Sequence, residues 1–230
     1  KIHCTMQQLP QLKQMCTSRA KSINKVNVQR LLRRRHKLFT SYSHCIRNQF
    51  SKVMFKYYSP LANIVFYQLV WFCTVLGGQQ YIIVPCLLLA LHIYLSKGRR
   101  EELLVMGICA IFGLLVDIVL TYGGLYVFTP PPLALPVPFW LVILWLGFAG
   151  TFRLALAFFI NRPPLAIAAA AVGAPLSYLA AGRLGAVSFP YGEPKTALVL
   201  SGVWIVLMSL FVFIVRKVDS SAHRNTHHPT

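Results

Sequence analysis

The stretch that decides the fold is LLVMGICAIFGLLVDIVLTYGGLYVF, which runs from Leu103 to Phe128. It is long enough to cross a bilayer as a helix, because a hydrocarbon core of ~30 Å needs roughly 20 helical residues. Asp117 is its one charged residue. Lipid offers the backbone no hydrogen-bond partners, so a helix, which satisfies its own polar groups, is predicted here.

Five more apolar segments flank this one, and together they predict a membrane domain. They run over about Leu61–Gly77, Tyr81–Leu95, Phe139–Ile160, Pro164–Val187 and Thr196–Val215. The segment that begins at Tyr81 is short, so it must thin the bilayer locally or borrow residues from the turn before it. None shows the strict alternation of a barrel strand. The sequence therefore predicts an all-α, polytopic bundle of six transmembrane helices over residues 58–217, followed by a short cytoplasmic tail at 218–230.

Composition also indicates a membrane protein. Of the 230 residues, 56% are hydrophobic and 12% are charged, whereas soluble domains carry about 25% charged residues. The mean hydropathy is +0.58, which excludes intrinsic disorder for most of the chain. Six cysteines show no metal or redox spacing, so neither a metal nor a cofactor is expected.

Basic residues alternate between the loops and set the expected orientation. They lie before the first segment, between the second and third, between the fourth and fifth, and after the sixth, at Lys52, Lys56, Lys97, Arg99, Arg100, Arg162, Arg216 and Lys217. The other loops carry no net positive charge. The positive-inside rule then places both termini in the cytoplasm. The alternative is five spans with a re-entrant second segment, which would put the two strongest basic loops on opposite sides.

Residues 1–57 form a basic extension that contains no Asp or Glu. The Arg30–Lys37 cluster is compatible with a nucleic-acid-binding arm, and the composition is compatible with an organelle targeting segment. We favour a third interpretation, in which the extension is disordered or not part of the native protein, which would begin at Met54. Nucleic acid is then not expected as a partner, and any attraction to anionic lipid follows from position alone.

Four motifs give the apolar body a recognisable order. They are FYQLVWFCTVLGG (Phe66–Gly78), LLLALHIYLS (Leu87–Ser96) with the acidic pair that follows its basic loop, FGLLVDIVLTYGGLYVF (Phe112–Phe128) and GAPLSYLAAGRLGA (Gly173–Ala186). Over about residues 66–215 the chain resembles a bacterial family of small polytopic inner-membrane proteins, domain-of-unknown-function family 2878. Where an Asn-His pair is expected in the family's fourth span, this chain has Arg153-Leu154. The resemblance implies a location and a topology but no reaction.

Polar residues inside the segments form a candidate intramembrane site. They are Asp117, Arg183, Arg153, Ser177 and His92. Charges at membrane depth are rare and are usually paired or functional. At 1.5 Å of rise per residue, the depth of Asp117 matches Arg183 better than Arg153, so a salt bridge between Asp117 and Arg183 is expected. A neutral Asp117, or a polar pocket for a lipid headgroup, ion or small solute, remains open, and His92 is interpreted as an interfacial histidine.

Small residues indicate how two of the helices pack. Gly173, Ser177, Ala181 and Gly185 recur every four residues in the fifth segment, and Gly113, Thr121 and Gly124 accompany Asp117 in the third. Because small residues let helix backbones approach closely, the third segment is expected to dock on the fifth. Pro175 is expected to kink the fifth.

Two classes of function remain open. The first is a non-enzymatic envelope or lipid-associated membrane component, whose partners are the bilayer and an unidentified lipid or small molecule. The second is a small-solute or lipid transporter or permease subunit. An enzyme comes third, because no metalloprotease, phosphate-loop or nucleophile-elbow motif occurs. The sequence does not fix an oligomeric state.

Overall fold

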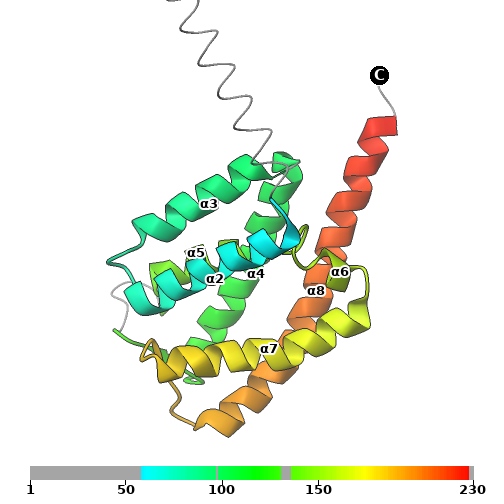
Figure 1. Ribbon diagram of the computed structural model, residues 1–230. Helices are drawn as coiled ribbons and strands as arrows, with labels where there is room; N and C mark the ends of the chain where they lie inside the picture. The colour runs from blue at the N-terminus through cyan, green and yellow to red at the C-terminus, as the bar shows by residue number, and fades with distance from the viewer. Residues whose placement is uncertain (1–57, 97, 131–135, 228–230) are drawn as a thin grey trace, which may run out of the picture. The chain divides into compact units, whose positions relative to one another are not determined.

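The computed structural model describes residues 58–96, 98–130 and 136–227, with side chains up to residue 222. The expectations for the basic extension 1–57 fall outside these residues. In the described part the chain is all-α apart from one pair of two-residue strands, and Figure 1 shows the arrangement of the helices. The helices are α2 (Pro60–Gly77), α3 (Ile83–Leu95), α4 (Arg99–Tyr122), α5 (Phe139–Ala149), α6 (Ala157–Ile160), α7 (Pro163–Arg183) and α8 (Glu193–His227), and the strands are β1 (Val127–Phe128) and β2 (Val187–Ser188).

Local sequence explains where the helices begin. The Ser59 hydroxyl accepts a hydrogen bond from the Ala62 amide, and Pro60 occupies the first turn of α2, both of which favour a helix N-terminus. Gly98, with a φ of 78°, precedes α4, so the chain turns there in a conformation that glycine adopts freely. α7 also starts with proline and continues as one helix through Pro175.

Four helices are long and apolar enough to cross a membrane: α2, α4, α7 and residues 193–222 of α8. The chain is therefore a multi-pass membrane protein. α3 has 13 residues and α5 has 11. At 1.5 Å per residue these two helices are only about 20 Å and 17 Å long, so neither alone spans the hydrocarbon core.

The fourth apolar segment is not the continuous helix that hydropathy predicts. α5 ends at Ala149 and α6 begins at Ala157, with non-helical turns between them. Broken backbone at membrane depth is tolerated only where protein or a water-filled cavity satisfies its polar groups. The side chains that satisfy it here belong to a buried polar cluster described below.

The predicted docking of the third segment on the fifth is wrong. α4 packs mainly against α5 and α8, and α7 packs mainly against α8. The reason is the indole of Trp145, which lies against Gly113 so closely that a Cβ there would be 2.5 Å from it. The small face of α4 therefore accommodates an aromatic ring from α5 rather than a second helix.

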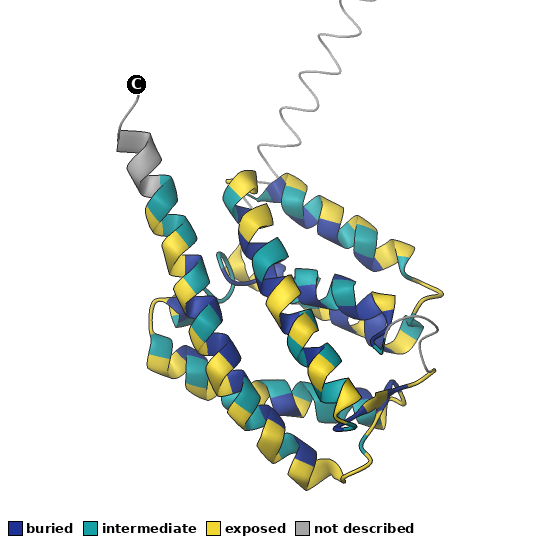
Figure 2. Ribbon diagram, turned by 180° about the vertical axis from the view of Figure 1, so that it is seen from behind, coloured by how far each residue is buried: buried dark blue, intermediate teal, exposed yellow. Residues whose placement is uncertain are grey.

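The pair of short strands and the lipid-facing surface complete the fold. β1 pairs antiparallel with β2, with Val127 opposite Ser188, and so joins the segment after α4 to the segment after α7. Large apolar side chains such as Leu198 and Val206 are exposed on the outer faces of the helices. Figure 2 shows exposed residues, in yellow, along the long helices, and a bilayer would cover such apolar positions.

Candidate functional site

Asp117 is a deeply buried acid in the second half of α4, and aromatic hydrogen-bond donors surround it. The residue is 1% exposed. Its Oδ1 accepts hydrogen bonds from the hydroxyls of Tyr126, at 2.5 Å, and Tyr178, at 2.6 Å, while its Oδ2 accepts from the Trp145 indole at 2.7 Å. Buried polar groups need such partners. Here three uncharged side chains from three different parts of the chain satisfy the carboxyl group.

The expected salt bridge between Asp117 and Arg183 is wrong. The Arg183 side chain is 76% exposed, and its Nη2 lies 3.9 Å from the Glu193 carboxylate across the turn between α7 and α8. Arg183 is the last residue of α7, so its guanidinium turns to the surface. Tyr178, lying deeper on the same helix, contacts Asp117 instead.

A second buried polar cluster lies where the fourth segment is broken. Glu102 is 4% exposed and binds two partners through its two oxygens. Its Oε1 lies 3.0 Å from His92 Nε2, and its Oε2 lies 3.2 Å from Arg153 Nη1. Arg153 also donates to Asp219 Oδ1 at 2.9 Å and to the Gly98 carbonyl at 3.2 Å. One guanidinium therefore links α4, the broken segment, the turn after α3 and the end of α8.

Tyr58 and Asn63 surround the second ring nitrogen of His92. Burial raises the pKa of the Tyr58 hydroxyl, so it stays protonated. This hydroxyl lies 2.6 Å from His92 Nδ1 and accepts a hydrogen bond from the Asn63 amide at 2.9 Å. The Asn63 Nδ2, which can only donate, also lies 3.4 Å from Nδ1. Both neighbours of Nδ1 can therefore donate to it, an arrangement that suits the tautomer of a neutral His92 with its proton on Nε2, the nitrogen beside Glu102.

Asn63 holds the broken backbone in place. Its Nδ2 donates to the Gly150 carbonyl at 3.4 Å, and its Oδ1 accepts from the Ala155 amide at 3.3 Å. These bonds replace part of the helical pairing lost between α5 and α6. At Gly150 a Cβ would lie 2.8 Å from His92 Nε2, so the close approach of the histidine requires glycine at this position.

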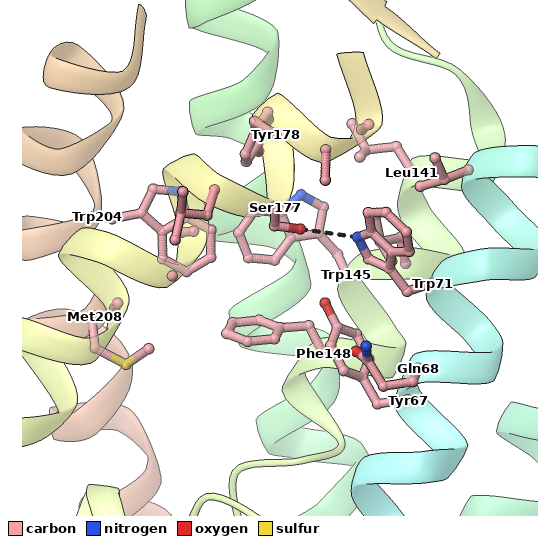
Figure 3. A pocket seen from close by; sticks show the side chains of 18 of the residues that line it. Tyr67, Gln68, Trp71, Leu141, Trp145, Phe148, Ser177, Tyr178, Trp204 and Met208 are labelled. Carbon is pink, nitrogen blue, oxygen red and sulfur yellow. Dashed lines mark hydrogen bonds between the residues drawn. The ribbon is translucent and has the colours of Figure 1, made fainter. Parts of the chain in front are cut away.

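A cavity of about 600 Å³ lies between α2, α5, α7 and α8 (Figure 3). Its walls are aromatic side chains, including Trp71, Trp145 and Trp204, and small residues of α7, including Gly173. None of its lining residues in the described part of the chain is charged. Inside it, Ser177 accepts a hydrogen bond from the Trp71 indole at 2.9 Å, drawn as a dashed line in Figure 3.

The family model for "Protein of unknown function (DUF2878)" matches residues 60–210. The chain belongs to this family. The expected resemblance is thus confirmed, and the family region contains the whole cavity and most of both polar clusters; Tyr58 and Asp219 lie just outside it. No curated protein and no solved structure matches the chain.

The five site residues predicted from the sequence of this DUF2878 chain do not form one site. His92 and Arg153 come together through Glu102. Asp117 sits in the aromatic cluster, Ser177 lines the cavity, and Arg183 is at the surface.

Sequence reasoning missed the partners that complete both clusters. They are Tyr58, Asn63, Glu102, Asp219, Tyr126, Trp145 and Tyr178. The position of Glu102 in the first turn of α4 was a usable signal, because a buried helix start often needs a polar partner. The aromatic donors gave no signal, since hydropathy counts tyrosine and tryptophan mainly as interface residues.

Proposed function

We propose that the protein is a non-enzymatic, lipid-binding component of the bacterial inner membrane, and that the cavity between α2, α5, α7 and α8 holds the acyl chain of a membrane lipid. The observation that carries this proposal is the cavity itself, at about 600 Å³ with an uncharged lining. Ligand pockets have volumes of roughly 300–1,000 Å³ and mostly apolar walls. Lipid chains are the apolar ligand that surrounds a membrane protein at the highest concentration.

The small residues of α7 support this role. Small residues in membrane helices usually let a second helix approach, but a Cβ at Gly173 would meet no atom within 4 Å. Gly173, Ser177 and Ala181 line the cavity instead. Rigid indoles form the opposite walls, so the space keeps its shape without a packed helix.

Filling the cavity tests the proposal. Gly173→Leu is expected to remove most of the lipid that remains bound to the purified protein in native mass spectrometry, and Gly173→Ala is expected to remove less. Gly202→Leu is the matched control, because Gly202 is also a helical glycine with open space around it but lies outside the cavity lining. Equal lipid content in Gly173→Leu and Gly202→Leu, with both variants folded by size-exclusion chromatography, would refute the proposal.

We also propose a six-crossing topology with both termini in the cytoplasm, in which α3 is a short crossing and α5 with α6 forms one interrupted crossing. Contacts between loops support the sidedness. Arg153 bridges Gly98 and Asp219, and Arg216 donates to the Ile160 carbonyl, so three connections with basic residues gather at one end. The β1–β2 pair joins two of the other connections.

Reporter fusions test this topology. Fusions after Gly98, Asn161 and Asp219 are expected to report cytoplasmic exposure, and fusions after Gly78, Pro132 and Gly192 periplasmic exposure, because basic loops stay inside. A periplasmic signal at Gly98 or Asp219 would contradict the arrangement.

A lipid transporter is the second candidate, and the interrupted α5–α6 segment favours it. Transporters commonly place their sites at discontinuous helices, and here the break lies beside the His92–Glu102–Arg153 cluster. Proteoliposomes with a fluorescent phospholipid separate the candidates: accelerated movement between leaflets supports transport, whereas binding without acceleration supports the first proposal.

A further inference from the structure

Two polar side chains on the cavity wall have no hydrogen-bond partner among the described residues. Tyr67 and Gln68 both line the cavity, and neither forms a hydrogen bond with another described residue. Figure 3 shows both near Phe148, away from the bonded pair of Ser177 and Trp71. Both residues lie near the middle of α2, where surrounding lipid chains offer no hydrogen bonds, so a ligand that bonds to this hydroxyl and amide is preferred.

The same cavity offers nothing to a charged group. No lining residue in the described chain is ionisable as a cation or a carboxylate. Asp117 is not among the lining residues. Tyr178 and Trp145, which do line the cavity, donate their polar hydrogens to the Asp117 carboxylate. Taking a phosphate or carboxylate into such a place would require desolvation without a compensating ion.

We propose that the occupant is an uncharged lipid, with its chain along the small-residue face of α7 and its hydroxyl or ester oxygens bonded to Tyr67 and Gln68. The proposal rests on the proposed function, since it names the ligand class of the same cavity. Gln68 is exposed and Tyr67 is half-buried, so the polar end of the lipid lies at the rim and the chain lies deeper. The Tyr67 hydroxyl and the Gln68 amide can each donate and accept a hydrogen bond, so both can bond to a hydroxyl or to an ester oxygen of the lipid.

The test compares three photoactivatable probes, of which the first two share the same diazirine-bearing acyl chain. Diacylglycerol, phosphatidic acid with the same two chains, and a long-chain isoprenoid alcohol that carries its own diazirine are incorporated with the full-length protein in proteoliposomes. Diacylglycerol is expected to label the protein more strongly than phosphatidic acid, which differs by one phosphate. Relative labelling by the alcohol distinguishes hydroxyl from ester recognition.

Variants tie the preference to the two side chains. Tyr67→Phe keeps the ring and its contact with Phe148 but removes the hydroxyl, so labelling by diacylglycerol is expected to fall about fivefold, the effect of one lost hydrogen bond. Gln68→Met is expected to act in the same direction. Tyr122→Phe is the control, because Tyr122 is 77% exposed and lies outside the cavity.

The possible outcomes separate the two proposals. If Gly173→Leu blocks labelling but phosphatidic acid labels as well as diacylglycerol, or Tyr67→Phe and Gln68→Met have no effect, the uncharged-lipid proposal is overturned and the lipid-binding function stands. If no probe labels in a way that Gly173→Leu reduces, the proposed function itself fails.

Discussion

Replacing Asp117 with leucine is expected to destabilise the protein more than any other single change in the bundle. Three donors, Tyr126, Tyr178 and Trp145, would lose their acceptor inside the protein. Each buried group left without a partner costs about 1–3 kcal/mol, so the total is a large share of a typical folding free energy of about 5–15 kcal/mol. The folded yield in detergent and the midpoint of thermal unfolding measure the loss.

Two further variants make this prediction specific. Asp117→Asn keeps one acceptor oxygen, which can face either the two tyrosines or the Trp145 indole. The amide N–H group then faces the other donors, so an intermediate loss of stability is expected. Arg183→Leu is the control and is expected to change little, because exposed ion pairs contribute about 0–1 kcal/mol and Arg183 is mostly exposed. A loss from Arg183→Leu equal to that from Asp117→Leu would mean that the two residues form the salt bridge after all.

The second large effect is expected at Arg153. Arg153→Leu would leave Glu102 buried without its cation and would release Asp219 on α8. Removing one partner of a buried pair costs about 3–5 kcal/mol. Arg153→Lys is expected to recover part of this, because a lysine keeps the charge but lacks the fork that reaches both acids. Thermal unfolding of the purified variants measures the series.

A double change distinguishes the ion pair from simple packing. Glu102→Gln removes the stranded charge, so the double variant Arg153→Leu with Glu102→Gln is expected to be more stable than the sum of the two single losses implies. Arg100→Leu, at an exposed position near the start of the same helix, is the control and is expected to be close to neutral. Strictly additive losses at Arg153 and Glu102 would contradict the pairing.

The class of fold and most helix positions could be predicted from the sequence, because apolar runs long enough to span a bilayer leave few alternatives. The break in the fourth segment could not. Over Phe139–Ile160 the residues are almost all apolar, and hydropathy does not show which backbone groups have partners. The break depends on Asn63 and His92, which lie more than 50 residues earlier in the chain.

The predicted salt bridge between Asp117 and Arg183 was wrong for a related reason. Rise per residue gives the depth of a side chain but not the direction in which it points around the helix axis. Asp117 points toward α5, where Trp145 fills the space above Gly113. Three of the four residues in the small-residue stripe, Gly173, Ser177 and Ala181, line the cavity instead of packing against the third segment, whereas Gly185 lies beyond the end of α7.

The measurement that tests the lipid-binding cavity most directly is the location of crosslinks from a photoactivatable acyl chain. After irradiation in proteoliposomes, peptide mass spectrometry is expected to find modified residues on the cavity side of α7, between Ala166 and Ala181, and beside Trp71 on α2. Modification confined to outward-facing residues of α8 such as Leu198, Val206 and Phe213, which are exposed, would show that lipid surrounds the bundle without entering it, and would contradict the proposal.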